Sequence, residues 1–159
     1  MKYLSGQEEK KAIKFMNIAA EIAMNSLCLR ARCGSIVVKD DEIIGKGFNS
    51  PPKNKKLESC LKDFLPENFK SDKTCCIHAE QRAIMDALKN NSNKIQESRI
   101  YFIRLDENGE KSYAGKPYCT ICSKMALDSG ISEFVLWHKE GICVYDIDEY
   151  NELSFSFRE

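Results

Sequence analysis

Apolar residues recur every three or four positions through residues 8–29, with charged side chains between them. This spacing predicts an amphipathic helix that packs on one face. The next two runs, CGSIVVKD and EIIGKGFN, are rich in β-branched residues and meet at two aspartates, which predicts a β-hairpin. From residue 50 to residue 74 the periodicity is lost among Pro, Lys, Asn and Ser. A connection of this length is typical of a functional loop, so we expect it to border a site.

Helical spacing returns over residues 77–90 and stops at an Asn-rich turn. The run SRIYFIRL then predicts a strand, and DENGEKSYAGKP predicts a polar loop. The run CTICSKMALDSG predicts a short helix that ends at Gly130.

Two further strands are predicted at SEFVLWH and ICVYD, and we expect the residues after them to form a frayed tail. The element order α, ββ, α, β, α, β, β predicts an α/β fold of three layers, α/β/α, in which a central mixed five-stranded sheet carries helices on both faces. The length suits a single domain over residues 1–159, with a loop insertion at about 50–75.

Composition restricts the partners. The 24 basic residues balance the 24 acidic ones, so there is no basic excess of the kind that nucleic-acid-binding proteins carry, and a small molecule is the expected substrate. The first residues are charged throughout, and no apolar run approaches a membrane span, so we expect a cytoplasmic protein without a membrane partner. Eight cysteines in a reducing compartment favour metal binding or reactive thiolates over disulfides.

Three of the candidate metal ligands stand at predicted helix starts. His78 opens one helix, and Cys119 and Cys122 open another, each after a loop that follows a strand. One His with two Cys is a ligand set of catalytic zinc sites, which leave the fourth position for water. Cysteines three apart lie on one helix face, and the helix N-terminus favours the thiolate that binds metal.

Glu80 follows His78 by two residues, so its carboxylate can lie beside the metal without binding it and can carry protons. Each feature also has a plain structural explanation: Glu is favoured in any first helical turn, and a lone C-x-x-C is common. In combination, and in this order, they predict a hydrolytic zinc site.

The segments HAE and PYCTIC resemble the H-x-E and P-C-x-x-C signature of the zinc-dependent cytidine and deoxycytidylate (dCMP) deaminase family. The resemblance extends from about residue 9 to about residue 146. It implies Zn²⁺ on His78, Cys119 and Cys122, and Glu80 as the proton shuttle. It further implies conversion of a cytosine nucleotide or nucleoside, dCMP-like or CMP-like, to the uracil form with release of ammonia, in a homo-oligomer.

Substrate contacts are expected from five residues: Asn49, Ala79, Tyr118, Arg30 and Arg32. The family's matching asparagine contacts substrate, although Asn49 is also an ordinary turn residue. Ala79 suits a close approach of a flat base to the backbone, and Tyr118 is placed to pack against a substrate ring. The two arginines match a basic element where a phosphate needs a cationic partner, and a solvated helix end explains them nearly as well.

Some alternatives stay open at this stage. The chain departs from the family pattern at Tyr118, which stands between Pro117 and the first Cys, and in the 50–74 loop, so another aminated base or heterocycle remains a candidate substrate. A base-editing deaminase acting on nucleic acid would need a cationic channel with stacking aromatics, which the zero net charge does not support. The thiols of Cys60, Cys75 and Cys76 are candidates for a second metal site.

Overall fold

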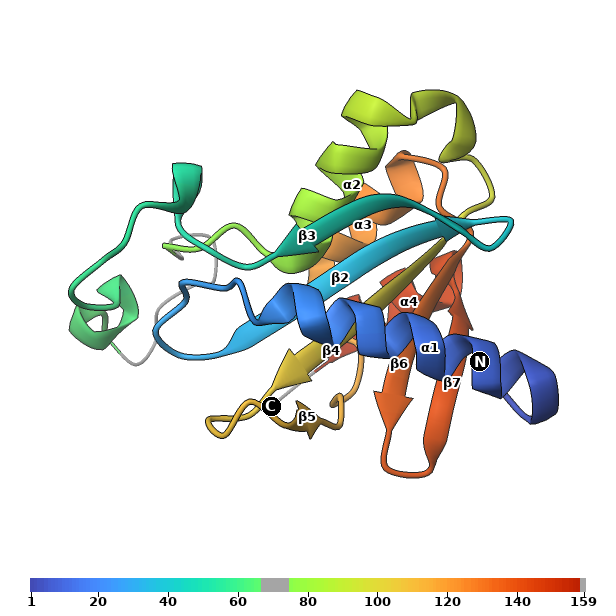
Figure 1. Ribbon diagram of the computed structural model, residues 1–159, viewed down its shortest axis with the longest axis horizontal. Coiled ribbons are helices and arrows are strands. Elements are labelled where there is room, and N and C mark those ends of the chain that lie inside the picture. The colour runs from blue at the N-terminus through green and yellow to red at the C-terminus, as the bar shows by residue number, and fades with distance from the viewer. Residues whose placement is uncertain (67–74, 158–159) are drawn as a thin grey trace.

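The computed structural model describes residues 1–66 and 75–157. Within these residues a seven-stranded sheet runs in the order β1-β7-β6-β4-β2-β3, and β5 pairs with β4 beside this path. The pair β4 and β6 is parallel and the other pairs are antiparallel, so the prediction of a mixed sheet is confirmed (Figure 1). The strands are β1 (Lys2–Tyr3), β2 (Arg32–Lys39), β3 (Glu42–Phe48), β4 (Arg99–Leu105), β5 (Lys111–Ser112), β6 (Glu133–His138) and β7 (Gly141–Asp146).

Five of these strands are the five that the sequence predicts, and β1 and β5, of two residues each, are additions to that prediction. β1 extends the sheet beyond β7, and β5 folds back on the end of β4. The short β5 turns the predicted polar loop into a hairpin arm.

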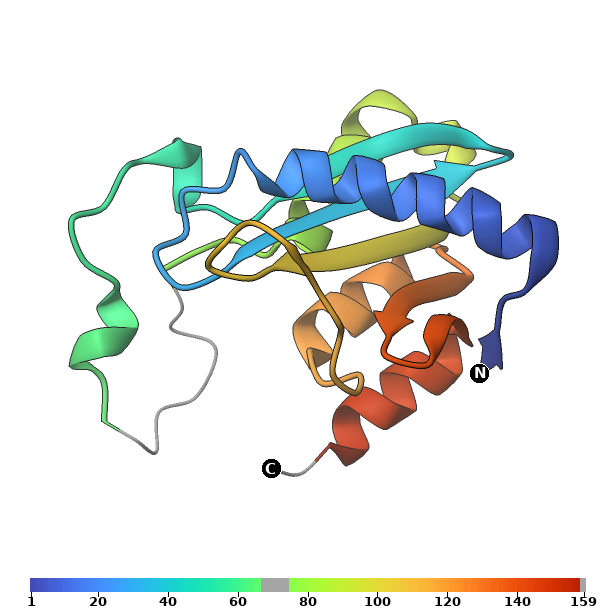
Figure 2. The same ribbon diagram turned by 60° about the horizontal axis from the view of Figure 1, so that its bottom comes forward.

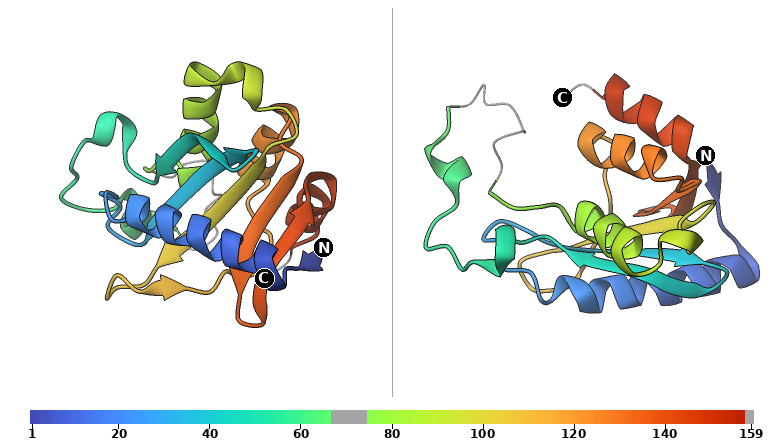
Figure 3. Two further views of the ribbon diagram at one scale, coloured as in Figure 1. Left: turned by 45° about the vertical axis from the view of Figure 1, so that its right-hand side comes forward. Right: turned by 90° about the horizontal axis from the view of Figure 1, so that it is seen from above.

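Helices cover both faces of the sheet, which confirms the three-layer prediction. Figure 2 and the right-hand view of Figure 3 show α1 (Gly6–Ala23) on one side of the sheet and the other three helices on the opposite side. The latter are α2 (Ala79–Asn90), α3 (Thr120–Asp128) and α4 (Ile147–Ser156).

Each face has its own hydrophobic core. Under α1, Phe15, Met16 and Ala19 pack on strand residues such as Ile36 and Ile103. On the other face the strands bury a second set against α2, α3 and α4. The set that faces α2, α3 and α4 includes Val37, Ile44, Ile100, Phe134, Leu136 and Tyr145. Because side chains alternate along a strand, neighbouring residues face α1 and the layer that carries His78, Cys119 and Cys122 in turn.

The first helix is shorter than predicted, because it ends at Ala23 and not near residue 29. Side chains from the end of β3 bind the chain beyond it: Ser26 Oγ lies 2.7 Å from Asn49 Oδ1, and the Leu27 amide donates to Ser50 Oγ at 2.9 Å. These tertiary hydrogen bonds take the place of further helical turns.

The expectation of a frayed tail was wrong, since the residues after β7 form α4. The Asp146 side chain caps this helix by accepting hydrogen bonds from the amides of Asp148 and Glu149. Tyr150 is buried and stacks on Phe134 with ring centroids 3.8 Å apart. A capping aspartate and apolar residues spaced by three and four were present in the sequence as helix signals.

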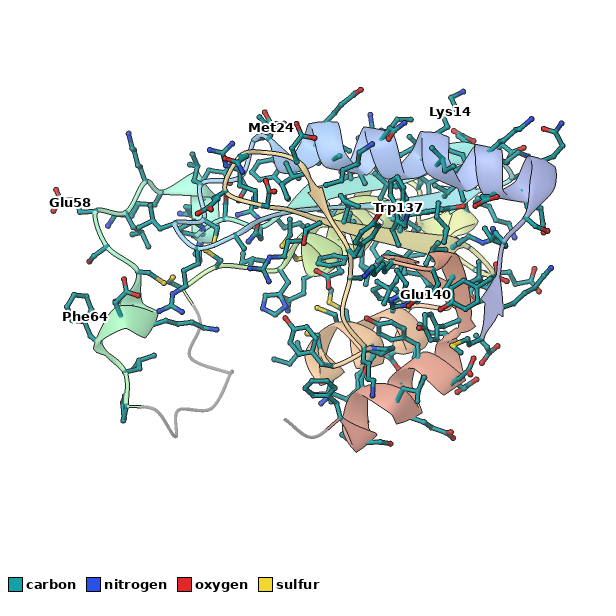
Figure 4. All side chains as sticks on the ribbon, turned by 90° about the horizontal axis from the view of Figure 1, so that it is seen from below. Lys14, Met24, Glu58, Phe64, Trp137 and Glu140 are labelled. Carbon is teal, nitrogen blue, oxygen red and sulfur yellow. The ribbon has the colours of Figure 1, made fainter. Side chains whose placement is uncertain are left out.

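Residues 50–66, which follow β3, extend away from the sheet in Figures 1 and 2. They hold two short 3₁₀ turns, at Pro52–Asn54 and Leu61–Phe64, and Figure 4 shows the labelled Glu58 and Phe64 on their outer part. Residues 67–74 of the predicted loop lie outside the described residues. Within the described ranges, the helices are too short or too polar to cross a membrane.

Candidate active site

The start of α2 is held close to β3 by two glycines. A Cβ on Gly47 would overlap the carbonyl oxygen of Ala79, and a Cβ on Gly45 would overlap that of Ala83, so only glycine permits this packing. His78 is the N-cap residue of the helix, and its amide donates to Gln81 Oε1 at 2.9 Å. The imidazole is thereby carried at a fixed helix start against the sheet.

The start of α3 carries the two cysteines. Cys119 is the N-cap residue, and its Sγ accepts a hydrogen bond from the Cys122 amide at 3.4 Å. This cap orients both sulfur atoms toward α2, because positions three apart lie on one face of a helix. Cys122 is fully buried and Cys119 is partly buried.

The two helix starts bring His78, Cys119 and Cys122 together. His78 Nδ1 lies 3.2 Å from Cys122 Sγ and 3.3 Å from Cys119 Sγ, and the three ligand atoms lie within 4.8 Å of one another. Around tetrahedral zinc such atoms are separated by about 3.5–3.8 Å, given bonds of about 2.3 Å to sulfur and about 2.0 Å to nitrogen. The donor set and its spacing therefore fit Zn²⁺, the cofactor of this site, with a small outward adjustment.

The electrostatics of the cluster favour a thiolate. A hydrogen bond with the Cys122 side chain is the main cause that lowers the pKa of Cys119, to about 4, and the neighbouring His78 lowers it further. The same thiolate raises the pKa of the His78 imidazole. The surroundings of Cys119 therefore favour its thiolate, the form that binds metal.

Glu80 is in the first turn of α2 and is only 6% exposed. Burial is the main cause that raises the pKa of its carboxyl, to about 7, and the Cys119 thiolate adds to the rise. A carboxyl with a pKa near neutrality exchanges protons readily in both directions, which suits a general acid and base.

A cavity of about 410 Å³ opens beside the cluster. Its lining includes His78, Glu80 and Cys119, so two of the three predicted metal ligands and the proton carrier face one open cavity. Apolar side chains that the sequence did not single out form another part of the wall: Phe102, Leu136 and Tyr150. Their position depends on how β4, β6 and α4 come together, which no local motif indicates.

Four of the five expected substrate-binding residues line this cavity: Asn49, Ala79, Tyr118 and Arg30. Asn49 is also a structural residue, because its Oδ1 accepts from the Cys33 amide at 2.7 Å and its Nδ2 donates to the Ala31 carbonyl at 2.8 Å. Tyr118 is 65% exposed and its ring lies 5.9 Å from that of Phe157.

Arg30 and Arg32, the two residues expected to bind a phosphate, differ in their position relative to the cavity. Arg30 lines the cavity and forms an ion pair with Asp63 at 2.6 Å, whereas Arg32 is exposed outside the cavity lining and approaches Met24 Sδ at 4.0 Å. Three cations that the sequence did not single out also line the cavity: Lys62, Arg104 and Lys116.

The three thiols of the second candidate metal site, Cys60, Cys75 and Cys76, also line the cavity. Cys60 Sγ lies 3.7 Å from Cys75 Sγ, and Cys76 contacts both Cys75 and Cys28. The structure thus brings the three cysteines of the second candidate metal site near one another, and that site stays a prediction.

Comparison with known proteins gives the family. The sequence profile described as "Cytidine and deoxycytidylate deaminase zinc-binding region" matches residues 9–138. The deoxycytidylate deaminase of Mycobacterium phage D29 is 31% identical over 134 residues, which cover 79% of this chain and 92% of that protein. The deoxycytidylate deaminase of Saccharomyces cerevisiae is 29% identical over 126 residues, which cover 76% of this chain but only 35% of the yeast protein.

Solved structures agree with this assignment. The dCMP deaminase of the cyanophage S-TIM5, in complex with dCMP and dUMP, has a TM-score of 0.55 at 25% identity and covers 82% of each chain. The cytidine deaminase of Burkholderia pseudomallei has a TM-score of 0.58 at 14% identity and covers 87% of this chain and 94% of that one, a likeness of fold alone. The family profile matches residues 9–138, and the structure brings His78, Cys119 and Cys122 together. The chain therefore belongs to the cytidine and deoxycytidylate deaminase family.

Proposed function

We propose that this protein is a zinc-dependent hydrolase that deaminates a cytosine nucleotide, with dCMP as the preferred substrate and dUMP and ammonia as the products. The observation that carries the proposal is the buried Glu80 carboxyl beside the cluster of His78, Cys119 and Cys122, at the wall of a cavity of about 410 Å³. A cavity of this size suits a small ligand.

His78, Cys119 and Cys122 are the residues that would hold the metal. When bound, zinc acts as a Lewis acid and makes a water molecule acidic enough to ionise near neutral pH. The chain itself contributes an anionic sulfur at Cys119, which offsets the charge of the cation, and a tight helix start that holds the three ligand atoms together.

Glu80 moves the protons of the reaction. Its carboxylate takes a proton from the attacking water and delivers it to ring nitrogen N3 of cytosine, which makes C4 more electrophilic. Once the water oxygen has bonded to C4, a second proton passes from the new C4 hydroxyl through Glu80 to the amino group. The bond from C4 to that nitrogen then breaks, ammonia leaves and the C4 carbonyl forms. The pKa near 7 that burial gives this carboxyl suits both directions of transfer at neutral pH.

The walls of the cavity hold and orient the base. The Ala79 amide is at the first helical position of α2 and has no acceptor within the helix, so it is available to a ring carbonyl. Asn49 keeps one N–H of its amide beyond the one donated to Ala31. The apolar side chains of Phe102 and Leu136 give a planar ring a surface from which water is excluded.

The choice of dCMP rests on the relatives. The phage D29 protein, which this chain matches over 92% of its length, is a deoxycytidylate deaminase, and the S-TIM5 structure holds dCMP and dUMP. We further propose that one deaminase domain over residues 1–159 carries the activity in the cytoplasm, as a homo-oligomer.

The test is ammonia release by zinc-loaded protein from dCMP, CMP, deoxycytidine, cytidine, cytosine and adenosine. The expected result is turnover of dCMP above the nucleosides, and loss of turnover in Glu80→Gln with zinc content and fold retained. Turnover of a nucleoside or of adenosine above dCMP would contradict the proposed substrate. Loss of zinc from Glu80→Gln would contradict the role of Glu80.

A further inference from the structure

The alternation of β4 places two cavity residues on one face of the sheet. Phe102 and Arg104 both line the cavity, whereas Tyr101 and Ile103 between and before them are buried in the core under α1. Phe102 is partly buried and Arg104 is exposed, so the strand leads from the apolar interior of the cavity toward its mouth. Two residues along a strand correspond to about 7 Å.

The cavity is cationic although the chain as a whole is neutral. Among the described residues of its lining, four are basic, and two carry acidic groups, the Glu80 carboxyl and the Cys119 thiol. The four basic residues are Arg30, Lys62, Arg104 and Lys116. A concave surface with an excess of one sign of charge concentrates a ligand of the opposite sign.

Arg104 differs from Arg30 in its ion pairing. Arg30 is bound to Asp63 at 2.6 Å, whereas no carboxylate among the described residues forms an ion pair with Arg104. Its guanidinium, which presents planar pairs of donors suited to a phosphate, is therefore available to a ligand.

The strand holds Arg104 in place. It pairs with Cys33 of β2 on one side and with Ser112 of β5 on the other, so its backbone is fixed by two neighbours. The chain beyond Ser112 continues along the cavity wall to Lys116, and the Ala114 amide ties this stretch to the Trp137 carbonyl at 2.8 Å. A second cation thus lies on the same wall as Arg104.

We infer that Arg104 binds the 5′-phosphate of the substrate and sets the preference for a nucleotide over a nucleoside, with Lys116 as a weaker second partner. The base lies inward along Phe102 and the phosphate lies at the mouth. The inference rests on the proposed function, because it assigns a residue to the phosphate of the same substrate. It replaces the pair expected from the sequence, since Arg32 is outside the cavity lining and Arg30 is engaged by Asp63.

The experiment compares kcat/KM for dCMP and for deoxycytidine in wild type, Arg104→Gln, Arg104→Lys, Arg32→Gln and Lys14→Gln. Lys14, labelled on α1 in Figure 4, is an exposed cation outside the cavity lining, and it controls for the loss of one positive charge. In Arg104→Gln we expect kcat/KM for dCMP to fall about ten- to a hundredfold, the effect of one charged hydrogen-bond pair. The value for deoxycytidine should stay within about twofold, and Arg104→Lys should recover part of the loss.

Binding without turnover gives an independent readout. Calorimetry on Glu80→Gln should show dCMP bound more tightly than deoxycytidine, and addition of Arg104→Gln should remove that difference. An unchanged dCMP preference in Arg104→Gln, or a preference lost in Arg32→Gln instead, would overturn the inference.

The two proposals fail in different ways. Wild-type protein that releases no ammonia from dCMP refutes the proposed function. Wild-type protein that prefers dCMP, and keeps that preference without Arg104, refutes only the phosphate assignment. An equal loss with dCMP and deoxycytidine would also refute it, because it would indicate structural damage and no contact with phosphate.

Discussion

Gly47 of β3 lies directly against Ala79, the first residue of α2, and no side chain fits between them. A Cβ on Gly47 would overlap the Ala79 carbonyl oxygen and crowd the Arg82 Cβ. Because His78 and Glu80 flank Ala79, the separation of this helix start from the sheet also sets the position of a candidate metal ligand and of the proton carrier.

We therefore predict that Gly47→Ala damages both stability and activity. Displacement of the helix start should lower the free energy of unfolding by about 1–3 kcal/mol, the usual effect of overpacking. The shift of His78 and Glu80 should lower kcat by about tenfold or more, since a small misplacement of catalytic groups is costly. Chemical denaturation and ammonia release measure the two effects.

Gly115→Ala is the matched control for unfolding, because no atom lies within 4 Å of the added Cβ. Its free energy of unfolding should equal that of wild type. Equal stability of Gly47→Ala and wild type would show that the helix can move away at no cost.

A second prediction concerns metal content. Cys122→Ser should lose one zinc per chain relative to wild type, because a hydroxyl is a far poorer zinc ligand than a thiolate. Cys143→Ala is the matched control: Cys143 is equally buried, but it is on β7 in the sheet core. Metal analysis by mass spectrometry after gel filtration should show the loss in the first variant alone, and retention of full zinc by Cys122→Ser would remove Cys122 from the ligand set.

The sequence was most informative where a local pattern carries the chemistry. The starts of α2 and α3 are marked by His78 and by Cys119 with Cys122, and the ligand set of catalytic zinc gave the reason to join them before the resemblance did. The sheet followed from five runs of β-branched residues. Local patterns also held the signals for α4, where Asp146 caps the helix and Tyr150 is buried, but the polar residues between them concealed the periodicity.

Other features depend on contacts between distant segments. Arg32 and Arg104 are both ordinary basic residues in β-strand patterns, and only the pairing of β2 with β4 decides which of them reaches the cavity. The end of α1 at Ala23 depends in the same way on hydrogen bonds from Asn49 and Ser50, more than 20 residues away. No window of sequence contains that information.

Asn49 provides a third prediction, because its two roles can be separated. Asn49→Ala would leave the Cys33 amide and the Ala31 carbonyl without their partner and should lower the free energy of unfolding by about 2–3 kcal/mol. Asn90→Ala is the control, since Asn90 is exposed and its side chain contacts only Asp86 among the hydrogen bonds of the described residues. Thermal and urea unfolding measure both variants.

The same variant tests substrate contact. If kcat/KM falls only in proportion to the fraction of molecules that are unfolded at the assay temperature, Asn49 acts on structure alone. A KM that rises in protein that is fully folded at that temperature would indicate a direct contact with substrate.

The last prediction concerns His138, at the end of β6. Its Nδ1 lies 3.1 Å from the Ala114 carbonyl oxygen and its Nε2 lies 2.7 Å from the Tyr145 hydroxyl. A carbonyl can only accept, so Nδ1 carries the proton, and in the neutral ring Nε2 accepts from the tyrosine. His138 thus connects the buried Tyr145 to the hairpin arm that lines the cavity, which makes it a positioning residue.

Removal of this link should loosen the arm and leave the zinc cluster in place. We expect His138→Phe, which keeps a ring but loses both hydrogen bonds, to raise KM for dCMP about tenfold with kcat within about twofold of wild type. Tyr145→Phe keeps the bond to Ala114 and removes only the hydroxyl, so its rise in KM should be smaller. Steady-state kinetics with zinc content as the control separates the outcomes: a fall in kcat with KM unchanged would place the effect at the reacting groups and contradict a role in positioning the arm.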